Sequence, residues 1–376
     1  MSEYQYYEFL AVDRPLDRRA QEALRAISTR AKITATSFTN HYEWGDLKGD
    51  PRKFMERWFD LHLYVTNWGT RRLMMRLPKR LLNRKDADRF LRGVDSVDVW
   101  AAGDSLVVDI RRDEVGRDDN WDDGSGWLAA LAPLRADVLS GDLRLFYLLW
   151  LMAVQDELVP DDESEPLSGI GPLTGPLEAC AEFFDIDRDL LQAAAEGGVS
   201  AAAKSRDDPR AVLAAISENE KTELLLRLVE GDTHVAAELK RRIRNEGRAT
   251  SSAAYRVVGD LRTRAQEIRE ASERAETERL EKERRRQAEE AKRALRARLK
   301  TLKQRGAAVW REIEDEVERR NASAYDRAAS LLSDLQALAA QEGNQSEFAH
   351  RLASIRTRHE SKRKLIERLN DLGMPV

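Results

Sequence analysis

The sequence predicts an α+β N-terminal unit, in which a small mixed sheet carries helices, followed by an all-α middle domain and a long C-terminal coiled-coil or helical-hairpin arm. Seven of the eight tryptophans lie in the first 150 of the 376 residues, so a large core can form there. Short aromatic runs alternate with helical patterns up to residue 117. Residues 260–303 lack glycine and proline and are rich in Glu, Arg, Lys and Ala, as in long helices. We therefore expect domains over residues 1–117, 118–250 and 251–376.

The N-terminal unit shows strand and helix patterns in alternation. We expect strands over residues 4–12, 33–44, 72–77, 97–101 and 105–111, and helices over residues 16–27, 51–68 and 86–94. The helix over 51–68 depends on an apolar stripe at steps of three and four, and His62 within it is expected to pack in the core. This order predicts one mixed sheet with helices on a face, whose last two strands form a hairpin through a turn at Gly103 and Asp104.

The middle of the chain reads as a small helical domain behind a polar boundary at residues 118–126. We expect two apolar helices over 127–154 with a turn at 140–142, a loop over 160–176, short helices over 177–184 and 187–196, and two more helices within 211–243. Cys180 lies between alanines on an apolar helix and is expected to be a buried thiol.

The C-terminal arm begins with an expected helix over residues 254–303, whose apolar seam is narrow and consists mostly of Ala and Leu. Because the rest of its surface is charged, this helix cannot bury itself alone. Gly306 permits a break, a second helix follows over 310–338, and Ser346 can cap a last helix that runs to Gly373. We expect residues 254–372 to meet a protein partner or a second copy of the chain.

Composition excludes several classes of protein. The single cysteine cannot form an internal disulfide or a Cys-based zinc site. The longest apolar run, residues 145–154, is half of the roughly 20 residues that cross a bilayer. There is no secretory signal pattern, no Gly-x-Gly-x-x-Gly after the first strand and no P-loop. We expect a cytoplasmic protein without a cofactor and without a membrane segment.

Charge is distributed unevenly along the chain. Residues 1–100 carry 19 basic and 14 acidic side chains, residues 101–240 carry 12 and 30, and residues 241–376 carry 32 and 23. The ends therefore have net charges of +5 and +9, and the middle has −18. Either the basic ends dock on the acidic middle, or one basic end meets nucleic acid while the middle meets a protein. We favour the first because the basic segments also carry many acids.

A basic run in the N-terminal unit is the candidate nucleic-acid surface. It contains Arg72, Arg76, Lys79 and Arg80, and alternation along a strand places the first two on one face. Trp68 lies close by in sequence and could stack on a base. The alternatives are a strand edge protected by charge and docking to the acidic middle.

The loop from His41 to Asp50 is the candidate enzymatic site. His41, Glu43 and Asp46 are potential acid, base or cation-binding groups, and we treat them as catalytic candidates. No second His or Cys follows at ligand spacing, so no metal site is predicted. Asp50 before Pro51 is also the pattern of a helix N-cap followed by the preferred first-turn proline.

Three stretches in the N-terminal unit, Glu3–Leu16, Ile33–Phe38 and Asn67–Met74, resemble an uncharacterised bacterial protein family. The resemblance implies a bacterial, cytoplasmic protein and carries no activity, cofactor or site residue. We therefore expect a non-enzymatic protein-interaction or adaptor protein that works through its coiled-coil arm. The alternatives are a nucleic-acid-associated factor using Arg72, Arg76, Lys79 and Arg80, and a metal-dependent enzyme using the His41–Asp50 loop.

Overall fold

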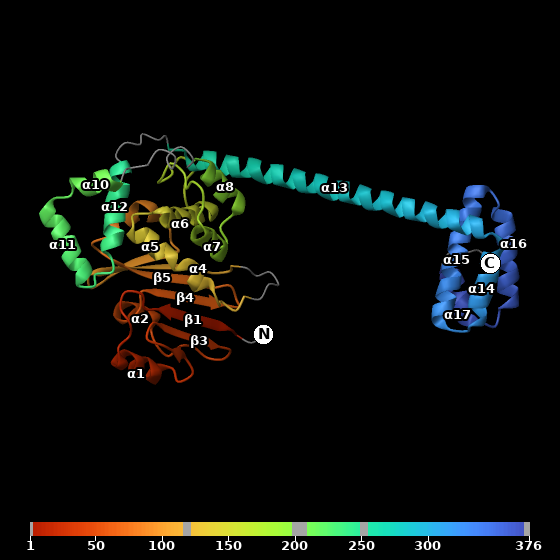
Figure 1. Ribbon diagram of the computed structural model, residues 1–376, viewed down its shortest axis with the longest axis horizontal. Helices are drawn as coiled ribbons and strands as arrows, with labels where there is room; N and C mark the ends of the chain where they lie inside the picture. The colour runs from red at the N-terminus through yellow and green to blue at the C-terminus, as the bar shows by residue number, and fades with distance from the viewer. Residues whose placement is uncertain (1–2, 116–121, 198–208, 249–254, 372–376) are drawn as a thin grey trace. The chain divides into compact units, whose positions relative to one another are not determined.

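The computed structural model describes residues 3–115, 122–197, 209–248 and 255–371 (Figure 1). The chain divides into two compact units, residues 1–272 and residues 273–376. Helix α13 (Val258–Arg305) contributes its first residues to one unit and its last residues to the other. No helix in the described part of the chain is both long and apolar enough to cross a membrane.

The first unit is built on a seven-stranded sheet with the order β2-β3-β1-β4-β5-β7-β6. The strands are β1 (Gln5–Leu10), β2 (Lys32–Ile33), β3 (Ser37–Tyr42), β4 (Leu61–Thr66), β5 (Arg71–Pro78), β6 (Val97–Ala102) and β7 (Ser105–Arg112). Every neighbouring pair is antiparallel, so the predicted mixed sheet is wrong. The predicted hairpin around Gly103 is confirmed, and it forms β6 and β7.

The predicted helix over residues 51–68 is wrong beyond its first two turns. Helix α2 spans Pro51–Arg57, and the chain then turns into β4. Leu61, Leu63 and Val65 are all buried in one core cluster, as alternate residues of a strand are. Apolar residues at both helical and strand spacing occur here, and the strand prevails because β1 and β5 pair with it on either side.

Helices cover both faces of the sheet, as Figure 1 shows. Helix α1 (Arg18–Ile27) and α2 lie on one face, where Phe9, Phe38, Met74 and Val107 form a core with them. The other face packs against helices α4 (Trp127–Leu131), α5 (Pro133–Leu139) and α6 (Arg144–Gln155). Two helices were expected over 127–154, and three form because Pro133 occupies the first turn of α5.

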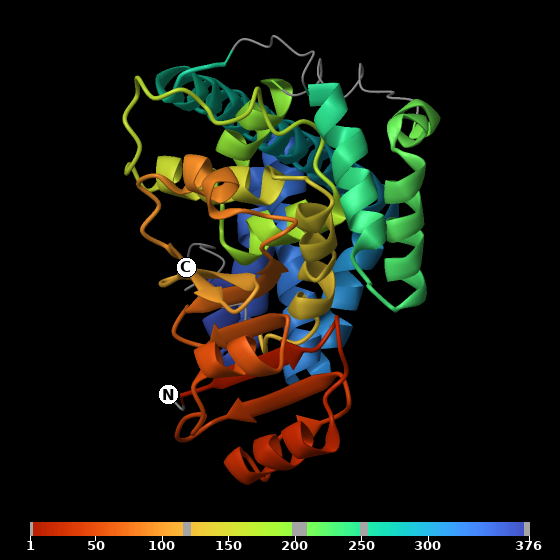
Figure 2. The same ribbon diagram turned by 90° about the vertical axis from the view of Figure 1, so that its left-hand side faces the viewer.

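Further helices complete the described part of the first unit. They are α3 (Arg84–Leu91), α7 (Gly175–Phe183), α8 (Arg188–Gly197), α10 (Pro209–Ala215), α11 (Glu218–Val229) and α12 (Val235–Arg248). One hydrophobic cluster joins the sheet, α4 to α8 and the start of α13, so no separate core begins at the predicted boundary near residue 117. Part of that boundary, residues 116–121, lies outside the described residues. Helices α11 and α12 lie side by side (Figure 2).

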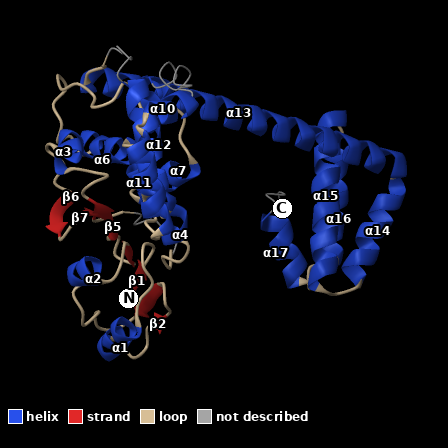
Figure 3. Ribbon diagram, turned by 60° about the vertical axis from the view of Figure 1, so that its left-hand side comes forward, coloured by secondary structure: helices blue, strands red, loops and turns tan. Residues whose placement is uncertain are grey.

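The second unit is a helical bundle. It contains the end of α13 together with α14 (Ala307–Glu318), α15 (Ala322–Glu342), α16 (Gln345–Arg358) and α17 (Arg363–Asp371). Helix α15 packs against α14, α16 and α17 (Figure 3). The expected second helix is divided at Asn321, whose side chain caps α15, and the expected last helix is divided before α17. Asn344, rather than Ser346, precedes α16, and a coiled coil remains a prediction.

Candidate functional site

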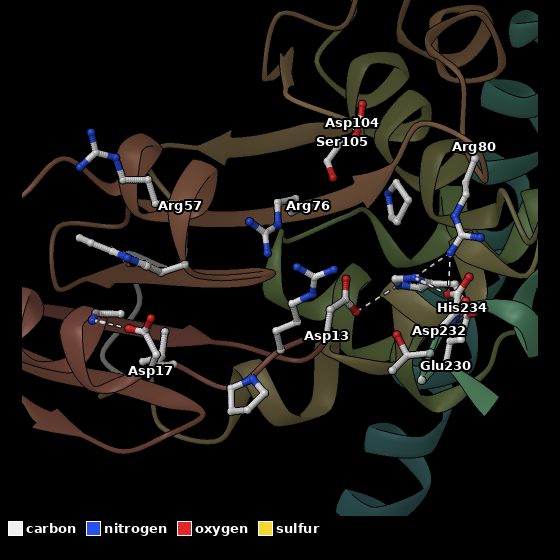
Figure 4. Close-up of a pocket in the computed structure, with 18 of the residues that line it drawn as sticks. Asp13, Asp17, Arg57, Arg76, Arg80, Asp104, Ser105, Glu230, Asp232 and His234 are labelled. Atoms are coloured by element: carbon white, nitrogen blue, oxygen red, sulfur yellow. Dashed lines mark hydrogen bonds and ion pairs between the residues drawn. The ribbon is translucent and has the colours of Figure 1, made fainter. Parts of the chain in front are cut away.

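A pocket of about 1130 Å³ opens on the first unit, where segments far apart in sequence meet (Figure 4). Its walls come from the β1–α1 connection and α1, the end of α2, the end of β5, the β6–β7 turn and the α11–α12 connection. The charged and aromatic residues that line it are Asp13, Arg14, Asp17, Arg19, Arg57, Trp58, Arg76, Arg80, Asp104, Arg227, Glu230, Asp232 and His234. A cavity of this size suits a small-molecule ligand.

A buried carboxylate holds Arg76 in place at this pocket. Asp60 is fully buried, and its Oδ1 accepts from Arg76 Nε at 3.0 Å and Nη2 at 2.7 Å. Its Oδ2 accepts from the backbone N–H groups of Val12 and Asp13 at 2.7 and 2.9 Å. Asp60 lies directly before β4, and its side chain joins the β1–α1 connection to strand β5.

Arg135 of helix α5 joins the helical layer to the same place. This buried guanidinium donates to Asp13 from Nη1 at 2.9 Å and from Nη2 at 2.6 Å, and its Nε donates to the Arg76 carbonyl at 2.8 Å. Burial by itself would raise the pKa of Asp13. Hydrogen bonds from His234 and Arg135 outweigh burial and hold the pKa of that carboxyl well below its usual range.

His234 connects the α11–α12 loop to this network, as Figure 4 shows. Its Nε2 lies 3.1 Å from Asp13 Oδ1, and its Nδ1 lies 3.3 Å from Arg80 Nη2. Because a guanidinium can only donate, we assign Nδ1 as the acceptor and Nε2 as the protonated nitrogen. Asp232 accepts from Arg80 at 2.7 Å and from Arg227 at 2.8 Å. The hydrogen bond from Arg80 is the main reason why the pKa of Asp232 is lowered.

This arrangement ties the α11–α12 loop to the rest of the pocket. Both ring nitrogens of His234 and both oxygens of Asp13 form hydrogen bonds within the protein. The network therefore fixes the pocket wall formed by the α11–α12 loop. Cys180 is no alternative nucleophile, because it is fully buried and burial raises the pKa of its thiol to about 12.

The basic residues singled out in the sequence all have internal partners. Arg72 pairs with Asp109 through two hydrogen bonds of 2.8 and 2.7 Å, and Lys79 donates to the Gly103 carbonyl. Arg76 and Arg80 pair with Asp60 and Asp232, and both line the pocket. Trp68 lies in the β4–β5 turn with 43% of its surface exposed and does not line the pocket.

The candidate enzymatic loop does not converge on a site. His41 is exposed on β3, where its ring stacks on Tyr4 with centroids 6.1 Å apart. Glu43 is exposed, and Asp46 accepts from Gln5 Nε2 at 2.6 Å. Asp50 caps α2 by accepting from the Arg52 N–H at 2.9 Å, which confirms the alternative interpretation. Within the described ranges, no group of three or more His, Cys, Asp or Glu side chains is placed to hold a metal ion.

Comparisons with protein-family models, curated proteins and solved structures found no match to this chain. Its function therefore has to be argued from the geometry above. Sequence reasoning found Arg76 and Arg80 in the basic run but missed Asp13 and His234. These two residues are 221 positions apart and belong to no local motif, so no sequence signal pairs them.

The Asp13 carboxylate should make stability depend on pH. Its pKa is lower in the folded protein than the value of about 3.9 in an unfolded chain. Its stabilising contribution is therefore present above that value and is lost as the pH falls through the folded pKa. We expect the difference in unfolding free energy between the natural chain and Asp13→Asn to be largest near neutral pH and to shrink below pH about 4. Urea unfolding followed by tryptophan fluorescence measures it, and a difference that is constant with pH would contradict this role.

Proposed function

We propose that this chain is a non-enzymatic interaction protein that binds another copy of itself through helix α13. The observation that carries this proposal is a stretch of α13 without packing. From Ala271 to Arg298 every side chain is exposed, except for Glu283, which is half-buried. We call residues 271–298 the exposed span. Leu280 and Leu295 within it are 53% and 44% exposed.

The exposed span gains little from its own side chains. Ion pairs one helical turn apart, such as Arg279–Glu276, Arg286–Glu283 and Lys292–Glu289, contribute about 0.2–0.5 kcal/mol each. Helices that lack tertiary packing are marginal in water. The apolar residues Leu280, Ala288, Ala291 and Leu295 fall within one quarter of the helix circumference at 100° per residue, and they form a seam that a second helix could cover.

The charge pattern favours a second copy in antiparallel orientation. Residues 291–305 carry seven basic and no acidic side chains, whereas residues 265–279 carry five acidic and three basic ones. An antiparallel pair centred near residue 285 brings each basic stretch opposite the acidic stretch of the other copy. Such complementarity selects the partner and its direction more than it adds affinity.

Two double variants of the intact chain test this proposal. Leu280→Gln with Leu295→Gln removes the apolar seam, and Lys282→Gln with Arg293→Gln places the same helix-forming residue on the opposite face. We expect sedimentation velocity to show a concentration-dependent dimer for the natural chain and for the control. The seam variant should dissociate at least about tenfold more readily, since two buried leucines each contribute more than about 1 kcal/mol.

The alternatives have less support in the geometry. The four cations of the proposed nucleic-acid surface are each held by a carboxylate or a carbonyl, so contact with phosphate would have to break those interactions. The enzyme alternative depends on His41, Glu43 and Asp46, which do not converge. A natural chain that is monomeric at all concentrations would contradict self-association through the exposed span.

A further inference from the structure

The pocket beside Asp13 contains cationic side chains that the internal network does not use. Arg14, Arg19 and Arg57 line it, and within the described part of the chain none of the three has an ion-pair or hydrogen-bond partner. By contrast, Arg76, Arg80 and Arg227 in the same walls are neutralised by Asp60 and Asp232. The uncompensated positive charge therefore lies on the walls formed by the β1–α1 connection, α1 and the end of α2.

The two ends of the pocket differ in chemistry (Figure 4). Arg57 and Asp17 lie at one end, while Arg80, Asp232, His234 and Glu230 lie at the other. Asp17 at the first end already accepts from the Ala20 N–H at 2.7 Å and caps α1. Trp58, which is half-buried, supplies an apolar wall beside Arg57. Guanidinium groups are the side chains best suited to bind phosphate and carboxylate oxygens in bidentate fashion.

We propose that this pocket binds a small molecule bearing an oxyanion of two or more negative charges, a phosphate or a polycarboxylate, through Arg14, Arg19 and Arg57. The acidic side chains Asp104 and Glu230 in the opposite walls accept from hydroxyl or amino groups elsewhere on the same molecule. His234 and Asp13 are held by the internal network, so they fix the part of the pocket wall to which they belong.

The exposure of these arginines determines what their replacement should do to folding and to ligand binding. Arg14 and Arg57 are exposed and form no ion pair or side-chain hydrogen bond in the described part of the chain, so we expect their replacement to leave the fold unchanged. Each charge-assisted hydrogen bond to the oxyanion that is lost weakens binding by about tenfold or more. Binding should also weaken as salt is added, because the groups involved are partly open to solvent.

Isothermal titration calorimetry of the intact chain at low salt tests the proposal, with inorganic pyrophosphate and citrate as separate probes. We expect at least one probe to bind the natural chain and to bind Arg14→Gln with Arg57→Gln about tenfold more weakly or worse. Arg18→Gln with Arg30→Gln removes the same charge from exposed residues outside the pocket and should bind as the natural chain does. Absence of binding for both probes, or equal weakening in both double variants, would overturn the proposal. Equal urea midpoints for all three proteins exclude misfolding as the cause.

Discussion

Replacing Asp60 by alanine should lower the unfolding free energy of the first unit by about 3–5 kcal/mol. The change removes the acceptor of four hydrogen bonds, and it leaves Arg76 with no carboxylate partner beside the buried Arg135. Arg76 is only 20% exposed, so its charge is left largely buried without a carboxylate, and two backbone N–H groups also lose their acceptor. Urea unfolding measures the loss through tryptophan fluorescence, since seven of the eight tryptophans lie in this unit.

Asp98→Ala is the matched control for this experiment. Asp98 also pairs with an arginine, Arg52, at 3.0 Å, but both side chains are about half exposed. Exposed pairs of this kind contribute less than about 1 kcal/mol. If Asp60→Ala costs no more than Asp98→Ala, the buried network does not hold the pocket walls together as we describe.

Replacing Glu165 by alanine should cost a similar amount, about 3–5 kcal/mol, at the start of helix α13. The Glu165 side chain is 1% exposed and accepts from the Tyr147 hydroxyl at 2.8 Å. It also accepts from Arg256 at three donors, namely the backbone N–H at 3.1 Å, Nε at 3.1 Å and Nη2 at 3.0 Å. Without it, Arg256 and the hydroxyl group of the fully buried Tyr147 lose a charged partner.

Glu196→Ala provides the comparison for Glu165→Ala. Glu196 binds Arg264 of α13 at 2.7 Å, but this pair is more than one third exposed on both sides. We expect less than about 1 kcal/mol for that change. Equal urea midpoints for the two variants would show that the buried contact does not anchor α13 to α6.

The sequence predicts helical and strand patterns well where only one period fits the residues. The hairpin around Gly103, the N-cap at Asp50 and the break of α13 at Gly306 each depend on one residue with a specific backbone role. Residues 51–68 do not meet this condition, because Leu61 and Val65 fit both the spacing of a helix and the alternation of a strand. Only pairing with β1 and β5 decides between them, and that pairing is not visible locally.

For His62, the predicted buried environment is confirmed although the predicted helix around it is wrong. Its expected core position is confirmed, since it is fully buried on β4 with its ring stacked on Phe9 at 3.9 Å. Burial lowers the pKa of His62 to about 3, so the imidazole stays neutral there. The environment could be predicted from apolar neighbours alone, whereas the strand depends on partners elsewhere in the chain.

The pocket could be predicted only in part, for the same physical reason. Arg76 and Arg80 lie in one conspicuous basic run, but their carboxylate partners Asp60 and Asp232 come from other segments. From the sequence alone, these cations are a candidate nucleic-acid surface, and the alternatives are a strand edge protected by charge and docking to the acidic middle of the chain. In the folded chain the unpaired cations of the pocket are others, among them Arg14 and Arg57, which belong to the β1–α1 connection and to α2.

Amide hydrogen exchange of residues 271–298 in the intact chain is the most direct test of the central claim, that the exposed span is covered by a second copy. We predict strong protection at high protein concentration, loss of protection on dilution, and loss at every concentration in the Leu280→Gln, Leu295→Gln variant. Exchange that is equally fast at low and high concentration would contradict the claim and would show that the exposed span is solvated along its length.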